Sequence, residues 1–207
     1  MNIKKESLKD KIASVLMQRI IDGELSLGEK IREAHLAKEF GVSQSPVREA
    51  ITTLVAQGIL EHHPNVGTHV KSCTKEETVE IYEVREALEI YAASQSDKGR
   101  KADLSLMKRS YDGMLHATQN KDFKSFVTHD QVFHTALLQA SNNTLLTDIW
   151  TQQYTRSSVQ TVISEYGEEL KDVVLMHLPI IEALESNNQE ALIVAIKAHY
   201  QRIIENL

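Results

Sequence analysis

An aspartate and a histidine stand one helical turn apart in the stretch DQVFHTALLQA, residues 130–140. At about 100° per residue, Asp130 lies at the centre of the helix face that carries Phe126 and Phe133, and His134 lies within about 40° of that centre. An unpaired carboxylate among apolar side chains is costly, so Asp130 should have a partner. Either His134 alone pairs with it, or both side chains bind one metal ion, because residues at i and i+4 point the same way.

Two further histidines point inward from later helical segments. In LKDVVLMHLPIIEAL, which is read as one helix, His177 falls among apolar positions and Pro179 lies on the opposite, solvent side, where a kink is tolerated. His199 shares a face with Ile196 and Ile203. One inward histidine is usually a hydrogen-bonded core residue, but four metal-competent side chains on three helices indicate a shared centre. The remaining histidines fall on flanks or in a hairpin, and we interpret them as surface or hairpin residues: His35, His62, His63, His69, His116 and His129.

An arginine also occupies an apolar helix face. In IYEVREALEIYAA, Arg85 lies in line with Ile81 and Leu88, and Glu89 follows one turn later. One interpretation is an intrahelical Arg85–Glu89 pair, which contributes little to stability. The other is that the Arg85 guanidinium binds the carboxylate of a ligand whose other end meets the metal.

Composition limits the class of protein. The single cysteine, Cys73, excludes an intrachain disulfide and a cysteine-rich zinc site, and it fits a reducing cytosol. No apolar run approaches the roughly 20 residues of a membrane span, and the N-terminal stretch has no signal-peptide apolar region. We therefore expect a soluble, cytoplasmic protein with no membrane partner.

The net charge of −6 is unevenly distributed along the chain. Residues 1–72 hold 10 Lys+Arg and 9 Asp+Glu, a net charge of +1, whereas residues 73–207 hold 13 and 20, a net charge of −7. A near-neutral first part beside an acidic second part indicates two domains with different partners.

Helical spacing organises the first part of the chain. It predicts a helix over residues 8–21 and a two-turn helix over 33–40, joined by a short connection. After a tight turn, the stretch SQSPVREAITTLVAQG predicts a third helix, which ends at Gly58. Ser45 before Pro46 is the expected N-cap, and Ser43 is the alternative.

The period then changes to that of a small β-hairpin, with strands over 59–63 and 68–71 and a turn at 64–67. The predicted fold is mainly α: a winged helix-turn-helix over residues 1–72 and an all-α antiparallel helical bundle over 75–207. The bundle should contain about six helices, with breaks near 97–101, 120–121, 141–143, 167 and 186–188.

A winged helix-turn-helix places the first turn of its second helix in a major groove and its hairpin near the adjacent backbone. Hydroxyls at a helix N-terminus suit phosphates, glutamine can pair with adenine, and arginine can serve phosphate or guanine. The alternative is a generic helical hairpin whose arginine is only solvated. The residues expected to meet DNA are Ser43, Gln44, Ser45 and Arg48 in the helix and Asn65 and Gly67 in the hairpin turn.

The run GVSQSPVREAITTL, followed by PNVGTHV, resembles the DNA-binding domain of GntR-family bacterial transcription regulators over about the first seventy residues. The resemblance implies binding of double-stranded DNA at a short inverted repeat. Gln44 stands where the family usually has arginine, which puts the operator sequence in doubt. Leu27 replaces a common proline, a structural change.

The patterns DQVFHTALLQASNN, MHLPIIEALESNN and AIKAHYQRI resemble the FCD effector-binding domain of the FadR subgroup of that family. The resemblance implies a helical bundle that binds a divalent metal through Asp130, His134, His177 and His199. Zinc is the expected ion, and nickel, manganese or iron also suit this ligand set. Met176 stands where a glutamate often precedes the third ligand. Similar domains bind small organic acids, so we favour carboxylate binding by Arg85.

These features predict a ligand-responsive transcription regulator that acts as a homodimeric repressor and is not an enzyme. The first rival is a metal-dependent, hydrolase-like enzyme, because His/Asp ligation with an open position can activate water. The sequence pattern shows no further inward carboxylate placed as a general base, which argues against it. The second rival is a DNA-binding protein whose metal is purely structural.

Overall fold

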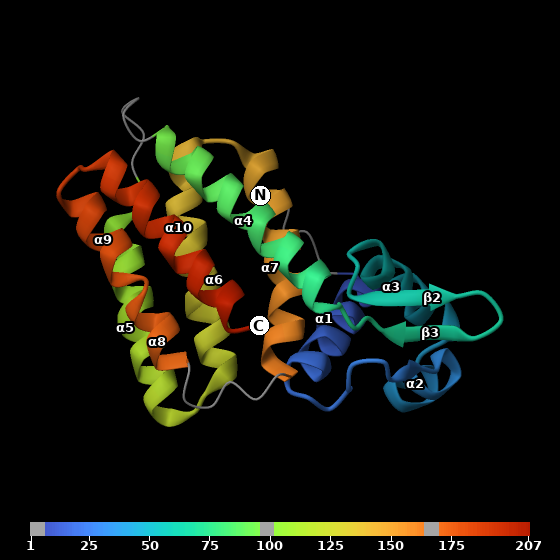
Figure 1. Cartoon of the computed structure of the whole chain (residues 1–207). Helices are drawn as coiled ribbons and strands as arrows, with labels where there is room; N and C mark the ends of the chain where they lie inside the picture. Colours follow the sequence, from blue (N-terminus) through green and yellow to red (C-terminus); the bar gives the residue numbers. More distant parts are fainter. Residues whose placement is uncertain (1–6, 96–101, 164–169) are drawn as a thin grey trace, which may run out of the picture. The chain divides into compact units, whose positions relative to one another are not determined.

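The computed structural model describes residues 7–95, 102–163 and 170–207. The chain divides into two units, the first built mainly from residues up to Cys73 and the second mainly from Thr74 onward (Figure 1).

The first unit begins with the two helices that the sequence predicts, α1 (Leu8–Ile21) and α2 (Glu33–Phe40). Ser7 and Asp10 form a capping box that satisfies free amides at the start of α1. Gly41 ends α2 in the left-handed region, at φ +65°, which a glycine adopts without steric cost.

Helix α3 (Gln44–Ala56) starts earlier than the favoured interpretation of the sequence. The N-cap is Ser43, so the choice of Ser45 is wrong and the alternative is correct. Pro46 is the third residue of the helix, where its missing N–H costs nothing because the first-turn amides have no intrahelical acceptor.

The sheet of this unit has three strands rather than the two of the predicted hairpin: β1 (Lys30–Ile31), β2 (Leu60–His63) and β3 (Gly67–Val70), in the antiparallel order β1-β3-β2. Strand β1 lies in the segment that the sequence analysis treated as a connection. A strand of two residues is too short to show an alternating pattern in the sequence. Its pairing depends on β3, where Lys30 lies opposite His69 and Ile31 lies opposite Thr68.

One apolar core holds the first unit together. Helix α3 packs against α1, and the buried side chains come from both helices, from α2 and from the sheet. The fully or almost fully buried members include Leu16, Ile20, Val47, Leu54 and Val70. Three helices followed by a hairpin and a short third strand form a winged helix-turn-helix.

The second unit is entirely helical in the segments that the structure describes. Its helices are α4 (Lys75–Ser94), α5 (Leu104–Asn120), α6 (Phe123–Leu138), α7 (Thr144–Ile163), α8 (Leu170–Leu175), α9 (Leu178–Glu185) and α10 (Gln189–Glu205), with a 3-10 turn η2 (Gln139–Ser141) after α6. Polar side chains cap several of them: Thr74 caps α4, Asp103 α5, Asp122 α6 and Asn188 α10.

The segment around His177 departs from the predicted single helix. A turn at Met176 and His177 separates α8 from α9, and Pro179 is the second residue of α9. Proline has no N–H to donate to the carbonyl four residues earlier, so a new helix begins here instead of a kinked one continuing. Pro179 is exposed, as predicted.

Helix α6 packs along α5 and also contacts α4, and α10 lies against both α4 and α9 (Figure 1). Phe133, Ile180, Ile196 and Tyr200 are fully buried in the resulting core. No helix of the described segments is long and apolar enough to cross a membrane.

Candidate metal centre

Three histidines from separate parts of the second unit meet in its interior. His134 comes from α6, His177 from the turn before α9, and His199 from α10, and their exposed fractions are 0%, 0% and 1%. One ring nitrogen of each lies within 4.8 Å of the others. The Nε2 atoms of His134 and His177 are only 3.3 Å apart.

Asp130 lies beside this cluster, one turn before His134 on α6. Its Oδ1 is 3.1 Å from Nε2 of His177 and 3.7 Å from Nε2 of His134. Burial raises the pKa of Asp130, but the charge of His134, the hydrogen bond and charge of His177 and the charge of Arg85 together lower it below its usual range. The carboxylate is therefore ionised, as a metal ligand must be.

Hydrogen bonds aim two of the imidazoles. Nδ1 of His177 is 3.0 Å from the carbonyl oxygen of Val173, to which it donates, so Nε2 is left facing the cluster. Nδ1 of His134 lies 2.9 Å from a carboxylate oxygen of Glu89, which leaves its Nε2 facing the cluster as well. Such partners on the far ring nitrogen are the usual support of metal-binding histidines.

His199 shows that the residues fit a bound ion. Within the described segments neither of its ring nitrogens has a hydrogen-bond partner, although the side chain is buried. Burial first, and then the neighbouring His177 and His134, hold the pKa of His199 well below its ordinary value of 6.5, so the imidazole is neutral. A buried, unpartnered nitrogen is expensive unless a cation binds it, and three nitrogens with one carboxylate suit a divalent ion.

Glu89 is a buried residue beside the cluster for which the sequence offered only Arg85 as a partner. The side chain is completely buried, and it accepts hydrogen bonds from His134, from Nε1 of Trp150 at 2.7 Å and from the hydroxyl of Tyr200. It is thus a further inward carboxylate, which the sequence analysis considered only as a partner of Arg85. Its inward position one turn after Arg85 was visible in the sequence, whereas its three partners were not.

Arg85 is buried, with 3% of its surface exposed, and it does not pair with Glu89: among the described residues it has no ion pair. Nη1 donates to Oγ of Ser157 at 2.9 Å, while Nε has no hydrogen-bond partner among the residues that the structure describes. Burial lowers the pKa of Arg85, but the surrounding phenols and carboxylates raise it above its ordinary value, so the group stays a cation. Four aromatic rings surround its guanidinium at 4.9–5.3 Å, and we call them the aromatic box: Tyr82, Trp150, Tyr154 and Tyr200.

The predicted DNA-contacting residues lie in two places in the first unit. Ser43, Gln44 and Ser45 are exposed at the start of α3, and Arg48 follows one turn later with 66% of its side chain exposed. Nε of Arg48 donates to Glu33 at 3.0 Å, which leaves the two Nη groups for another acceptor.

The turn of the hairpin holds the other two. Asn65 and Gly67 both have positive φ angles, +63° and +117°, which asparagine and glycine tolerate best. Nζ of Lys30 donates to the carbonyl of Val66 between them, so strand β1 supports the turn.

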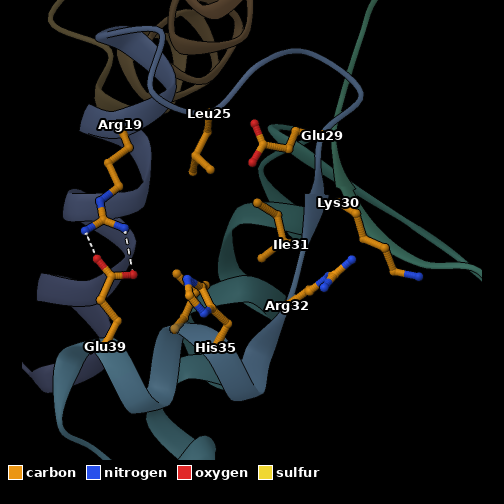
Figure 2. A pocket seen from close by; sticks show the side chains of 9 residues that line it. Arg19, Leu25, Glu29, Lys30, Ile31, Arg32, His35 and Glu39 are labelled. Atoms are coloured by element: carbon orange, nitrogen blue, oxygen red, sulfur yellow. Dashed lines mark hydrogen bonds and ion pairs between the residues drawn. The ribbon is translucent and has the colours of Figure 1, made fainter.

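A surface hollow beside β1 adds exposed charges that the sequence analysis did not single out. Figure 2 shows Lys30 and Arg32 there, with His35 on α2 and the Arg19–Glu39 ion pair on the opposite side. Because Glu39 already accepts two hydrogen bonds from Arg19, that guanidinium is not free for an anion.

Two family models match the chain in the order in which these units occur. The model described as "Bacterial regulatory proteins, gntR family" matches residues 8–70, and the FCD domain model matches residues 80–202. The chain belongs to the GntR family.

Relatives of the GntR-family protein cover nearly its whole length. The probable D-xylose utilization operon transcriptional repressor of Paenarthrobacter nicotinovorans is 28% identical over 93% of this chain and 85% of that protein. The gluconate operon transcriptional repressor of Bacillus subtilis is 24% identical over 97% of this chain and 85% of that protein. The crystal structure of a GntR regulator from Rhodococcus sp. RHA1 shares the fold, with a TM-score of 0.86 at 23% identity over 96% of both chains.

The predicted family and fold are thus confirmed: a GntR winged helix-turn-helix is followed by a helical FCD domain, in a DNA-binding regulator of transcription. The relatives and the shared fold are those of regulators rather than enzymes. The metal ligands, the residues that contact DNA and the role of Arg85 remain predictions.

Proposed function

We propose that this GntR-family protein is a homodimeric repressor of a short inverted-repeat operator, and that a small carboxylate controls its affinity for DNA. In this proposal one divalent metal, zinc first among the candidates, is held by Asp130, His134, His177 and His199. The observation that carries it is His199, a buried neutral imidazole with no hydrogen-bond partner in the described part of the chain, beside two histidine nitrogens 3.3 Å apart.

The ion, when bound, supplies a Lewis-acid site for one oxygen of the carboxylate. Arg85 provides the second contact, because its buried Nε has no partner within residues 7–95, 102–163 and 170–207 and the guanidinium remains charged. The aromatic box keeps water from the guanidinium, which strengthens a charge-assisted hydrogen bond to an anion.

Charge balance favours an anionic effector. A divalent ion and Arg85 bring three positive charges, whereas the carboxylates of Asp130 and Glu89 bring at most two negative ones. One uncompensated buried positive charge is costly, and a monocarboxylate neutralises it. The same arithmetic opposes a neutral ligand such as an uncharged sugar.

The hydrolase-like alternative gains nothing from Glu89. A general base must be free to take a proton from water, whereas Glu89 already accepts from an imidazole, an indole and a phenol. The purely structural role of the metal is the other alternative, and it predicts no change in DNA affinity when small carboxylates are added.

Three measurements on the full-length protein test the proposal. Elemental analysis should find about one ion per chain, and His134→Ala should lower metal affinity while His129→Ala leaves it unchanged. A panel of small carboxylates is then ranked by thermal stabilisation of the metal-bound protein. Finally, the best ligand should change operator affinity by roughly 5- to 150-fold, the usual range of allosteric coupling.

Arg85→Ala should abolish that response while metal content and ligand-free DNA binding persist. The matched control is Arg109→Ala, at an exposed position of α5 where the arginine donates to Ser105. A response of the Arg85 variant equal to that of the wild type would show that the anion is held elsewhere. The proposed role as a repressor would be contradicted if the metal-bound, ligand-free protein did not bind its own upstream DNA selectively.

A further inference from the structure

Glu89 joins three helices through one buried carboxylate. Its donors are His134 on α6, Trp150 on α7 and Tyr200 on α10, and Glu89 itself lies on α4. The indole and the phenol share the oxygen Oε1. A buried carboxylate is costly without hydrogen-bond donors, and these three donors offset the cost of burying Glu89.

Each donor also belongs either to the proposed metal cluster or to the aromatic box. His134 is the metal ligand whose Nδ1 faces Glu89. Trp150 and Tyr200 are two walls of the aromatic box, with ring centroids 5.0 and 5.3 Å from the Arg85 guanidinium. In the described contacts, Glu89 is therefore a hydrogen-bond partner that the metal cluster and the box share.

We propose that Glu89 is a positioning residue that transmits metal occupancy at His134 to the aromatic box around Arg85. The proposal rests on the metal site proposed above and deepens it, because it names the residue that makes the carboxylate contact depend on the metal. The ion and the anion then bind cooperatively through this chain of hydrogen bonds.

The two ring nitrogens of His134 explain the direction of the effect. An ion on Nε2 leaves the ring proton on Nδ1, which donates to Glu89, and it fixes the ring at both nitrogens. Without an ion the hydrogen bond to Glu89 remains, but Oδ1 of Asp130 is 3.7 Å from Nε2, too far for a hydrogen bond, so the ring is held mainly at Nδ1. The donor of Glu89 is then less firmly oriented, and the positions of the carboxylate, Trp150 and Tyr200 loosen with it.

The first test is the affinity of the full-length, metal-free protein for Zn²⁺ alone. Glu89→Gln keeps the shape of the side chain but removes the charge that holds Nδ1–H of His134, and it should weaken Zn²⁺ binding roughly 10- to 100-fold. Glu83→Gln, at an exposed position of the same helix, should bind Zn²⁺ as the wild type does. Equal affinity in the Glu89 variant and the wild type overturns the proposal.

The second test uses the indole itself, since Trp150 is the single tryptophan of the chain. In the wild type, Zn²⁺ should change Trp150 fluorescence with the same concentration dependence as binding. In Glu89→Gln, Zn²⁺ at saturating concentration should change the emission much less than in the wild type, because the ring contact of His134 with Trp150, with centroids 5.5 Å apart, remains while the hydrogen-bonded route is weakened. A full wild-type fluorescence change in the saturated variant would show that the signal travels by another route and would overturn the proposal.

Two outcomes are kept apart by this design. Absence of Zn²⁺ binding to the wild type contradicts the proposed metal site, whereas normal binding by Glu89→Gln contradicts only the role of Glu89. If circular dichroism shows that Glu89→Gln does not fold, Tyr200→Phe removes a single donor and keeps the charge. That variant should show a shifted metal-free emission and a several-fold weaker Zn²⁺ affinity, and wild-type values for both would overturn the proposal.

Discussion

His199→Leu should make the metal-free protein more stable and the metal-bound protein less stable than the wild type. The reason is that His199 brings two nitrogens into the core and neither has a hydrogen-bond partner in the described segments. A buried unsatisfied polar group costs about 1–3 kcal/mol. Leucine has no polar atom and a similar size, so the substitution removes this cost.

Packing offsets part of the gain. The His199 ring meets the rings of His177 and Tyr200 edge-on, with centroids 4.4 and 5.2 Å away, and such pairs contribute about 0.5–1.5 kcal/mol. Two unsatisfied nitrogens against two ring pairs leave the metal-free variant a net gain of about 1–3 kcal/mol in the free energy of unfolding. That corresponds to a melting temperature roughly 2–12 °C higher for a chain of this size.

The order reverses when Zn²⁺ is present. The wild type should gain about 4 kcal/mol when the free ion is at 1,000 times its dissociation constant. The variant lacks one of the four proposed ligands and should gain far less. The assay is thermal unfolding followed by circular dichroism, with chelator and with Zn²⁺, for wild type, His199→Leu and the exposed-site control His116→Leu.

The reasoning fails in either of two ways. A metal-free variant clearly less stable than the metal-free wild type would mean that His199 has a partner and contributes to the core as an ordinary polar residue. A variant with the full stabilisation by Zn²⁺ would mean that the ion binds without His199.

Three further predictions concern the winged helix-turn-helix. Gly67→Ala should cost about 1–3 kcal/mol and weaken operator binding, since φ is +117° and the new methyl meets Lys30 at 3.0 Å; Gly23→Ala, with φ +73° and open space around it, is the control that should bind DNA normally. Arg48→Ala should weaken operator binding and reduce its salt dependence by about one counterion, as measured by fluorescence anisotropy at several salt concentrations. The hydrogen bond from Arg19 holds the pKa of Glu39 in the folded protein below its ordinary value of 4.5. The Arg19–Glu39 pair therefore stabilises the fold above pH 4.5, and this stabilisation is lost as the pH falls through the lower pKa of the folded state. Glu39→Gln should make stability depend less on pH in that range, as measured by acid unfolding.

Local periodicity and end signals were enough to predict most helices of the winged unit. The predicted bounds 8–21 and 33–40 match α1 and α2, because apolar spacing and the residues that end a helix lie within the same short stretch. The inward direction of Asp130, His134 and His199 followed from the same periodicity, since a helix fixes which side chains share a face.

Features that depend on a distant partner were decided only by tertiary structure. Strand β1 exists because Lys30 and Ile31 pair with residues 37–39 positions later, and two residues carry no pattern of their own. The break before α9 depended on whether the chain bends or restarts at Pro179, a choice that packing around His177 makes.

The surroundings of the site show the same division. Helical spacing placed Arg85 on an apolar face and offered Glu89, one turn later, as its partner. In the folded protein Arg85 instead contacts four aromatic rings and donates to Ser157, 72 positions away in the sequence. Glu89 accepts from donors that are 45, 61 and 111 positions away. A helix sets the direction of a side chain within one turn, but which group meets it depends on which helices pack together, and that is a property of the whole bundle.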